Sequence, residues 1–337
     1  MSDSALQTSH RGSAERLQPR REHSFDRRRA APQPRGRHAE RGAGPIVVGV
    51  DGRKRSKDAL ALAATLAEQT GGDLQLVHAH GYGPLEHILG DDGYRALVRT
   101  AFNASFHQVR EIVGEGHARE MRAIPDASPA AGLERIAESE EAQMIVVGPS
   151  RRAGLGRLRL GGVTERLLSG ATVPVAVAPS GYSSGERRLA TVGCAFDGSP
   201  ESRLALDWAD ALARRSDAQL RVISVHSPIA FGDLGVDGAV SRESTNEALR
   251  GEIEREQLEA ITGRRAHAVV LTGNPARELA RASKETDILV MGSRGYGPVR
   301  ATLLGGVSQY VIRHASCPVV VCPRGAVEEG SRSAGAS

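Results

Sequence analysis

An internal repeat constrains the fold of this chain more than any other feature of its sequence. The segment IVVGVDGRKRSKDALALAATLAEQTGGDLQLVHAH, residues 46–80, aligns without a gap with VGCAFDGSPESRLALDWADALARRSDAQLRVISVH, residues 192–226. The offset is 192 − 46 = 146 residues, and at this offset Asp51 aligns with Asp197. A repeat of this length is a duplicated domain and not a solenoid unit. The sequence therefore predicts two copies of one domain.

Each copy alternates between short apolar runs and amphipathic segments. In the second copy we expect strands at ATVGCAF, LRVISV, HAVVL, ILVM and VVVC, and helices after Ser199, over 241–261, over 275–284 and from Val307. Aromatic residues make up only 3% of the chain, so the cores must be aliphatic, which suits parallel sheets covered on both faces. The pattern favours the flavodoxin-like strand order or a close relative. We predict an α/β fold of two tandem doubly wound domains, each with a five-stranded, mostly parallel sheet in the order 3-2-1-4-5.

Composition separates the repeated part from both ends of the chain. Residues 1–44 hold ten Arg and five Asp or Glu, a net charge of +5, so the whole-chain charge of +4 leaves 4 − 5 = −1 for the rest. This segment is rich in Arg and Pro and poor in apolar residues, which is typical of a disordered tail. We expect domains over 45–180 and 189–324, a linker over 181–188 and a second disordered tail over 325–337.

The cysteines and the apolar runs argue for a cytoplasmic protein. Three cysteines are too few and too unevenly spaced for a disulfide framework or a zinc site, so we expect reduced thiols. No apolar run approaches the roughly 20 residues that a membrane span requires, and the N-terminus lacks the apolar core of a signal peptide. We therefore expect no membrane partner.

A glycine-rich segment follows the fourth predicted strand of the second copy. The chain reads ILVMGSRGYGPVRATLLGGVSQYVIRHASCPVVVC over residues 288–322. Ligands of doubly wound sheets bind beyond the carboxyl ends of the strands where the strand order reverses, here between the first strand, ending at Asp197, and the fourth, ending at Gly292. Glycine lets a ligand approach the backbone closely, and the free N–H groups of a helix N-terminus attract anions. We expect an anion at this edge.

The strand-ending Asp, the spacing Gly292-x2-Gly295-x9-Gly305 and the following VSQYVIRHASCPVVV closely resemble the universal stress protein family. Over about residues 45–324 the chain looks like a tandem, two-domain member. The resemblance implies ATP or a related adenine nucleotide, with or without Mg²⁺, in the glycine loop. It also implies that paired domains dock through their last strands, here within one chain, and it leaves a homodimer open.

The resemblance assigns a role to each part of the site. Asp197 would contact the ribose, the backbone near Val225 would face the adenine, and the glycines with the start of the following helix would hold the phosphates. Arg294 or Arg300 can add charge-assisted contacts to phosphate, although each arginine taken alone fits a solvated loop residue better. The predicted nucleotide-binding residues are Asp197, Val225, Gly292, Arg294, Gly295, Gly305, Gly306, Val307 and Ser308.

Two departures from the family pattern bear on affinity. Gly306 stands where the family usually has Ser or Thr, so one hydroxyl contact is lost; Ser308 can substitute for it, or can be a helix-capping or exposed serine. In the first copy a weaker site would use Asp51, Gly148, Gly161 and Gly162. There Arg151 or Arg152 falls opposite Gly295, according to the alignment of the loop. We expect the first copy to bind nucleotide weakly or not at all.

Other chemistry is less well supported. There is no G-x-x-x-x-G-K-[ST] motif, and His78, His80 and His226 fit partly buried structural histidines better than metal or acid–base groups. We predict a cytoplasmic nucleotide-binding protein of stress response or regulation with a protein partner, not an enzyme, and at most a slow ATP hydrolase. The alternatives are an ATP-using enzyme of the same α/β class and a scaffold that binds nucleic acid through its arginine tail. We do not expect nucleic acid as a partner.

Overall fold

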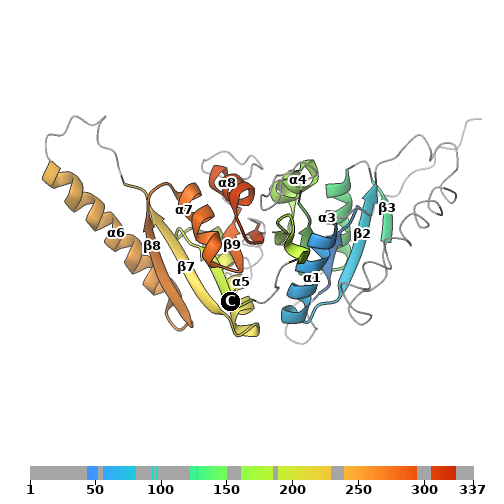
Figure 1. The fold of residues 1–337 in the computed structure, drawn as a ribbon, viewed down its shortest axis with the longest axis horizontal. Helices are drawn as coiled ribbons and strands as arrows, with labels where there is room; N and C mark the ends of the chain where they lie inside the picture. The colour runs from blue at the N-terminus through green and yellow to red at the C-terminus, as the bar shows by residue number, and fades with distance from the viewer. Residues whose placement is uncertain are drawn as a thin grey trace, which may run out of the picture. The chain divides into compact units, whose positions relative to one another are not determined.

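The computed structural model describes residues 44–51, 56–80, 93, 96, 122–126, 128–149, 161–184, 189–228, 239–293 and 305–323 (Figure 1). The predicted tails, 1–44 and 325–337, lie outside these residues, except for residue 44. The glycine loop from Arg294 to Leu304, with Gly295, also lies outside the described residues. What is said below of the fold and the site concerns the described residues.

The described elements alternate in both repeats, as the sequence predicts. The first repeat contains β1 (Ile46–Gly49), α1 (Ser56–Thr70), β2 (Leu74–His80), β3 (Arg122–Pro125), α3 (Pro129–Ser139), β4 (Met144–Val147), α4 (Gly162–Gly170) and β5 (Val175–Val177). The second contains β6 (Thr191–Ala195), α5 (Pro200–Arg215), β7 (Gln219–His226), α6 (Ala239–Ile261), β8 (Ala266–Thr272), α7 (Pro275–Ala282), β9 (Ile288–Gly292), α8 (Gly306–His314) and β10 (Val319–Cys322). Short 3₁₀ turns lie at η1 (Tyr182–Ser184) and η3 (Ser283–Glu285).

Most predicted boundaries agree with the structure to within one or two residues. The helix expected over 275–284 is α-helical only to Ala282 and continues as the 3₁₀ turn η3. Asp197 lies two residues beyond β6 and does not end it. α5 begins at Pro200 behind the N-cap Ser199, as expected, because proline suits the first helical position and serine caps it.

The described strands form one sheet in the order β3-β2-β1-β4-β5-β10-β9-β6-β7-β8. Within each repeat the neighbouring described strands pair in parallel, and the order is third, second, first, fourth, fifth, as predicted. The two repeats meet where β5 pairs antiparallel with β10. The α/β class and the docking of the repeats through their last strands are therefore confirmed.

The register of β5 with β10 is symmetric, as if a twofold axis passed through the middle of the pairing. Ala176 lies opposite Val320, Val177 opposite Val319 and Val175 opposite Val321. The central pair is separated by 320 − 176 = 144 residues, the offset that also relates Gly148 to Gly292 (292 − 148 = 144). Only this central pair joins equivalent residues of the two repeats, and the two flanking pairs are related to each other by the twofold axis, as they would be in a symmetric dimer.

One ion pair crosses this junction, and the symmetry-equivalent positions of the two repeats do not form a second one. Arg313 of α8 lies 3.4 Å from Glu165 of α4. At the offset of 144 the equivalent positions are Gln309 (165 + 144) and Ser169 (313 − 144), which carry no charge. The two repeats have therefore diverged in sequence at their shared junction.

Two apolar layers cover the sheet, one on each face. The layer on one face includes α1 and α5, and the layer on the other includes α3, α4, α7 and α8. Successive strand residues alternate between them, as with Cys194 and Ala195, because side chains of a strand point to opposite faces. Trp208 packs against the first layer, which agrees with a packing role. Of the described helices, none combines the length and apolar character needed to cross a membrane.

A buried carboxylate anchors the start of the connection between the repeats. Asp58 of α1 is only 5% exposed and accepts hydrogen bonds from the backbone N–H groups of Gly181 (3.0 Å) and Ser183 (2.9 Å). Tyr182, between them, packs against the apolar layer of α1 and α5. Part of the expected linker is thus an ordered turn attached to the first repeat.

We expect Asp58→Ala to lower the free energy of unfolding by about 2 kcal/mol, because it leaves two backbone N–H groups without their acceptor. Chemical denaturation measures this loss. Glu252→Ala is the control, since Glu252 is exposed and pairs with exposed Arg255 at 3.8 Å; its effect should stay within about 0.5 kcal/mol. Equal effects of the two substitutions would contradict the anchoring role of Asp58.

Candidate functional site

A pocket opens at the carboxyl ends of β6, β7 and β9 in the second repeat. The strand order reverses between β6 and β9, which is the place that doubly wound sheets use for ligands. Five of the predicted nucleotide-binding residues line it, and Gly305 and Gly306 precede the lining residue Val307. The lining residues are Ala195, Phe196, Asp197, Ser199, Ser202, Ile223, Val225, Pro275, Leu279, Met291, Gly292, Val307 and Ser308.

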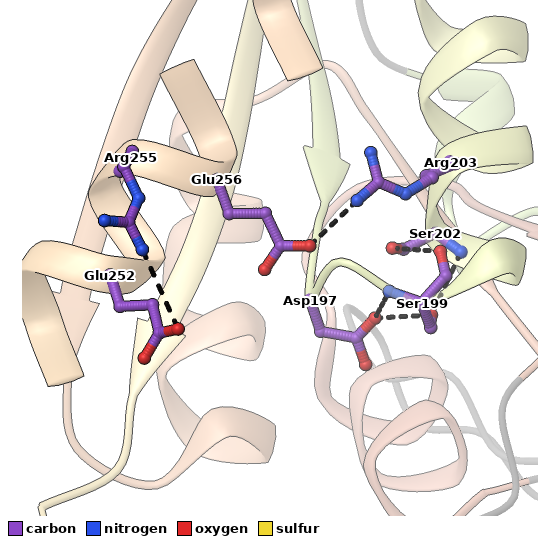
Figure 2. Close-up of polar contacts among 7 residues, drawn as sticks. All are labelled: Asp197, Ser199, Ser202, Arg203, Glu252, Arg255 and Glu256. Atoms are coloured by element: carbon purple, nitrogen blue, oxygen red, sulfur yellow. Dashed lines mark hydrogen bonds and ion pairs between the residues drawn. The ribbon is translucent and has the colours of Figure 1, made fainter. Parts of the chain in front are cut away.

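Asp197 stands in a turn whose geometry is fixed by short hydrogen bonds (Figure 2). Its Oδ1 accepts from the backbone N–H of Ser199 at 3.1 Å and from the Ser199 hydroxyl at 2.5 Å. The Ser199 hydroxyl in turn accepts from the N–H of Ser202 at the start of α5, at 3.2 Å. Gly198, between Asp197 and Ser199, has a φ of +76°, a conformation that glycine adopts without strain. The carboxylate is therefore held at the pocket wall before any ligand arrives.

A second part of the pocket lining, away from the Asp197 turn in the sequence, is apolar. Ile223 and Val225 come from β7, Met291 from β9, and Pro275 and Leu279 from α7. Side chains of this kind present a dry surface to a flat ring and no charge to select against it. The pocket thus combines an apolar wall with one carboxylate, Asp197.

The pocket lining also includes the N-terminus of α8. Gly305 is the N-cap residue, and the first turn of the helix continues through Gly306, Val307 and Ser308. The first N–H groups of a helix have no partner within the helix and carry a partial positive charge. A β-carbon added to Gly306 would have no atom within 4 Å among the described residues, so none of these fills the space in front of this backbone.

Ser308 is predicted to contact phosphate through its hydroxyl, or else to be an exposed or helix-capping serine. The structure agrees with neither of the last two. Ser308 is 2% exposed, and its hydroxyl donates to the carbonyl oxygen of Gly292 at 3.2 Å. It is therefore neither an exposed serine nor the N-cap of α8. Its hydroxyl joins the end of β9 to the start of α8, which fixes the two predicted phosphate-binding segments relative to each other.

Glycine is required at position 292 for a packing reason that the sequence does not reveal. A β-carbon at this position would lie 2.9 Å from the Cβ of Glu201 and 3.0 Å from its carbonyl carbon, both in the first turn of α5. Distances this short require the backbone to shift. Close packing of β9 against α5 demands glycine here, whether or not a ligand binds.

The first repeat retains its four predicted residues in a different arrangement. The Ser56 hydroxyl donates to Asp51 Oδ1 at 2.8 Å, whereas Asp197 receives its bonds from the neighbouring Ser199. Gly148 directly follows β4, Gly161 is the N-cap of α4, and Gly162 opens that helix. Residues 150–160 lie outside the described part, so the effect of Arg151 or Arg152 remains a prediction.

The other candidate groups have structural roles or no visible site. A ring nitrogen of His78, Nδ1, lies 2.8 Å from the carbonyl oxygen of Val50, as expected of a structural histidine. The side chain of His226 is buried, and its Nε2 has no hydrogen-bond partner among the described residues. The described part of the chain contains no group of three or more His, Cys, Asp or Glu side chains placed to hold a metal ion.

The cysteines are unsuited to nucleophilic chemistry. All three are buried and free. Burial raises the pKa of the Cys317 thiol to about 12 and that of the Cys322 thiol to about 12, and it raises the pKa of Cys194 further. A thiolate is the reactive form, so these thiols are inert near neutral pH.

Sequence reasoning missed most of the pocket wall. Phe196, Ser202, Leu279 and Met291 line the pocket without any motif that marks them. Ser199 was recognised only as a helix start, although it also binds Asp197. Their common signal is position, since each lies near the carboxyl end of a strand or in the first turns of the helix that follows one.

We expect Gly292→Ala and Gly306→Ala to differ in stability although both glycines belong to the predicted phosphate-binding set. Gly292→Ala should lower the free energy of unfolding by about 1–3 kcal/mol, because the new methyl group overlaps the backbone of α5. Gly306→Ala has open space and a helical backbone, and should change stability by less than about 1 kcal/mol. Thermal or chemical unfolding of both variants tests this, and a harmless Gly292→Ala would disprove the packing argument.

Comparison with known proteins agrees with the repeat and the fold. The model of the universal stress protein family matches residues 43–179 and again residues 189–323. A universal stress protein of Mycobacterium tuberculosis is 31% identical over 293 residues, covering 82% of this chain and 96% of its own length. One of Mycolicibacterium smegmatis is 31% identical over 287 residues, with the same coverage of both chains.

A solved structure has the same fold over most of the chain. A universal stress protein from Archaeoglobus fulgidus superimposes with a TM-score of 0.61 at 21% identity and covers 83% of this chain and 98% of its own. The duplicated strand order, the antiparallel junction of the last strands and the family match over both repeats lead to one conclusion: this chain belongs to the universal stress protein family.

Proposed function

We propose that the second repeat binds ATP or a related adenine nucleotide, and that nucleotide occupancy regulates the contacts of this protein with a protein partner during stress. The observation that carries the proposal is the convergence of Asp197, Val225 and the N-terminus of α8 on one pocket at the strand-order reversal. Asp197 and Val307 are 307 − 197 = 110 residues apart in the sequence, and the fold brings them to the same pocket.

Each part of a nucleotide finds a suitable chemical partner in this pocket. The adenine would lie against the apolar wall of Ile223, Val225 and Leu279. The carboxylate of Asp197 can accept hydrogen bonds from ribose hydroxyls, because it is an acceptor and hydroxyls are donors. The phosphates would face the N–H groups at the start of α8, where the helix dipole favours negative charge.

The pocket is better suited to binding than to catalysis. Asp197 is the only ionisable side chain among the described lining residues, and its Oδ1 is already engaged by Ser199. A Mg²⁺ ion accompanying the phosphates would find this one carboxylate there and would keep mostly phosphate and water ligands. We therefore expect ATP hydrolysis, if measured, to be slow.

Nucleotide should raise the melting temperature of the protein, because a ligand that binds only the native state stabilises it. The measurement is thermal unfolding of the full chain with ATP, ADP and AMP, together with a search for nucleotide that copurifies. Calorimetric titration should give close to one site per chain. No retained nucleotide and no shift with any of the three would contradict the proposal.

Gly306→Ser should strengthen nucleotide binding roughly tenfold, because a hydroxyl there can donate a charge-assisted hydrogen bond worth about 1.5 kcal/mol. A β-carbon at Gly306 meets no atom within 4 Å, so the serine fits. Gly162→Ser is the matched control in the first repeat, where the added carbon also meets nothing within 4 Å. Equal gains from both substitutions would show that both repeats bind.

A further inference from the structure

We propose that this pocket selects nucleotides whose ribose carries free 2′ and 3′ hydroxyl groups, and that Glu256 enforces the selection. The inference rests on the proposed nucleotide site and adds a specificity-determining residue to it. Glu256 belongs to α6, a helix that contributes nothing to the described pocket lining. Its side chain extends from α6 toward Arg203, on the α5 side of the turn that carries Asp197 (Figure 2).

The carboxylate of Glu256 packs on the turn that holds Asp197. A β-carbon added to Gly198 would lie 2.6 Å from the carboxyl carbon of Glu256, and closer still to one of its oxygens. Gly198 directly follows Asp197 in the chain. Two carboxylates, from β6–α5 and from α6, therefore flank the same turn at the proposed ribose end of the pocket.

An arginine of α5 beside this turn is paired with Glu256. Arg203 of α5 donates to a Glu256 carboxylate oxygen at 2.8 Å (Figure 2), and its guanidinium lies 5.6 Å from the centroid of the Phe196 ring. In dinucleotide-binding folds a carboxylate at the ribose selects a free 2′ hydroxyl, and a nearby arginine instead accommodates a 2′ phosphate. By pairing with Arg203, Glu256 would keep this guanidinium from turning toward a phosphorylated ribose.

The selection follows from hydrogen-bond roles and from charge. Ionised carboxylates only accept hydrogen bonds, so Asp197 can bind a ribose hydroxyl but not a phosphate oxygen, which has no proton to donate at neutral pH. A phosphate monoester on the ribose would also bring negative charge toward two carboxylates, and like charges at short range repel. Sites built to bind a hydroxyl discriminate strongly against ligands that lack it.

The experiment is a competition titration on the full chain with bound ATP. The competitors are AMP, adenosine 2′,5′-bisphosphate and adenosine 3′,5′-bisphosphate, which differ only in phosphorylation of the ribose. We expect both bisphosphates to compete at least roughly tenfold more weakly than AMP. Glu256→Gln removes one charge and releases Arg203, and should bring the bisphosphates to within about threefold of AMP while AMP itself changes little.

Glu252→Gln is the matched control. It lies one turn earlier on α6, is exposed and pairs with Arg255 at 3.8 Å, away from Asp197 (Figure 2). This variant should keep the wild-type gap between AMP and the bisphosphates. An unchanged ATP affinity shows that each variant is folded.

The outcomes separate the two proposals. If the wild type does not bind ATP, the proposed function is wrong. If ATP binds and the bisphosphates compete as well as AMP, the function stands and the selection is overturned. If the wild type discriminates but Glu256→Gln keeps the full gap, the role assigned to Glu256 is overturned.

Discussion

The parallel pairing of β6 with β9 determines where the pocket of the second repeat lies. Their register is Val192 with Ile288, Gly193 with Leu289 and Cys194 with Val290. The helix that follows β6 covers one face of the sheet, and the helix that follows β9 covers the other. Because the two connections leave on opposite sides, the carboxyl edge between these strands cannot be covered by either helix. The pocket is thus a consequence of strand order, and the side chains determine only what it accepts.

Packing and ligand binding make separate demands on the same glycines. Gly292 must lack a side chain because α5 passes within van der Waals contact, whereas Gly306 faces open space. A glycine motif therefore mixes positions that the fold requires with positions that a ligand would require. Only the first kind can be identified from the packing of the protein alone. Reading every glycine of the loop as a phosphate contact would misassign Gly292 in part.

The architecture was predictable from the sequence because its causes are local. The alternation of apolar runs with amphipathic segments predicted the order of the described strands, and Ser199 with Pro200 predicted the start of α5. The repeat offset predicted a second copy. These signals lie within a few residues or repeat at a fixed distance, so a single sequence contains them.

The remaining features depend on contacts between distant residues. The bond between Arg203 and Glu256 joins residues 53 apart, and Asp58 meets Ser183 across 125 residues. Neither pair carries a local pattern, so the sequence analysis could not identify either contact. The burial of Ser308 was also missed, because its partner is the carbonyl of Gly292, 16 residues away. Side-chain pairing across elements requires the fold to be known first.

Covalent fusion changes what the junction between β5 and β10 has to achieve. Two separate chains that met through this short antiparallel ladder would have to recover the entropy lost on association, and their pairing would depend on concentration. In one chain the partner strand is always present at a high effective concentration, whatever the amount of protein in the cell. The two sides of the junction are therefore free to differ, as they do at the ion pair of Arg313 and Glu165, whose counterpart positions are Gln309 and Ser169. Fusion thus lets evolution alter one half of the chain while the other half keeps its sequence.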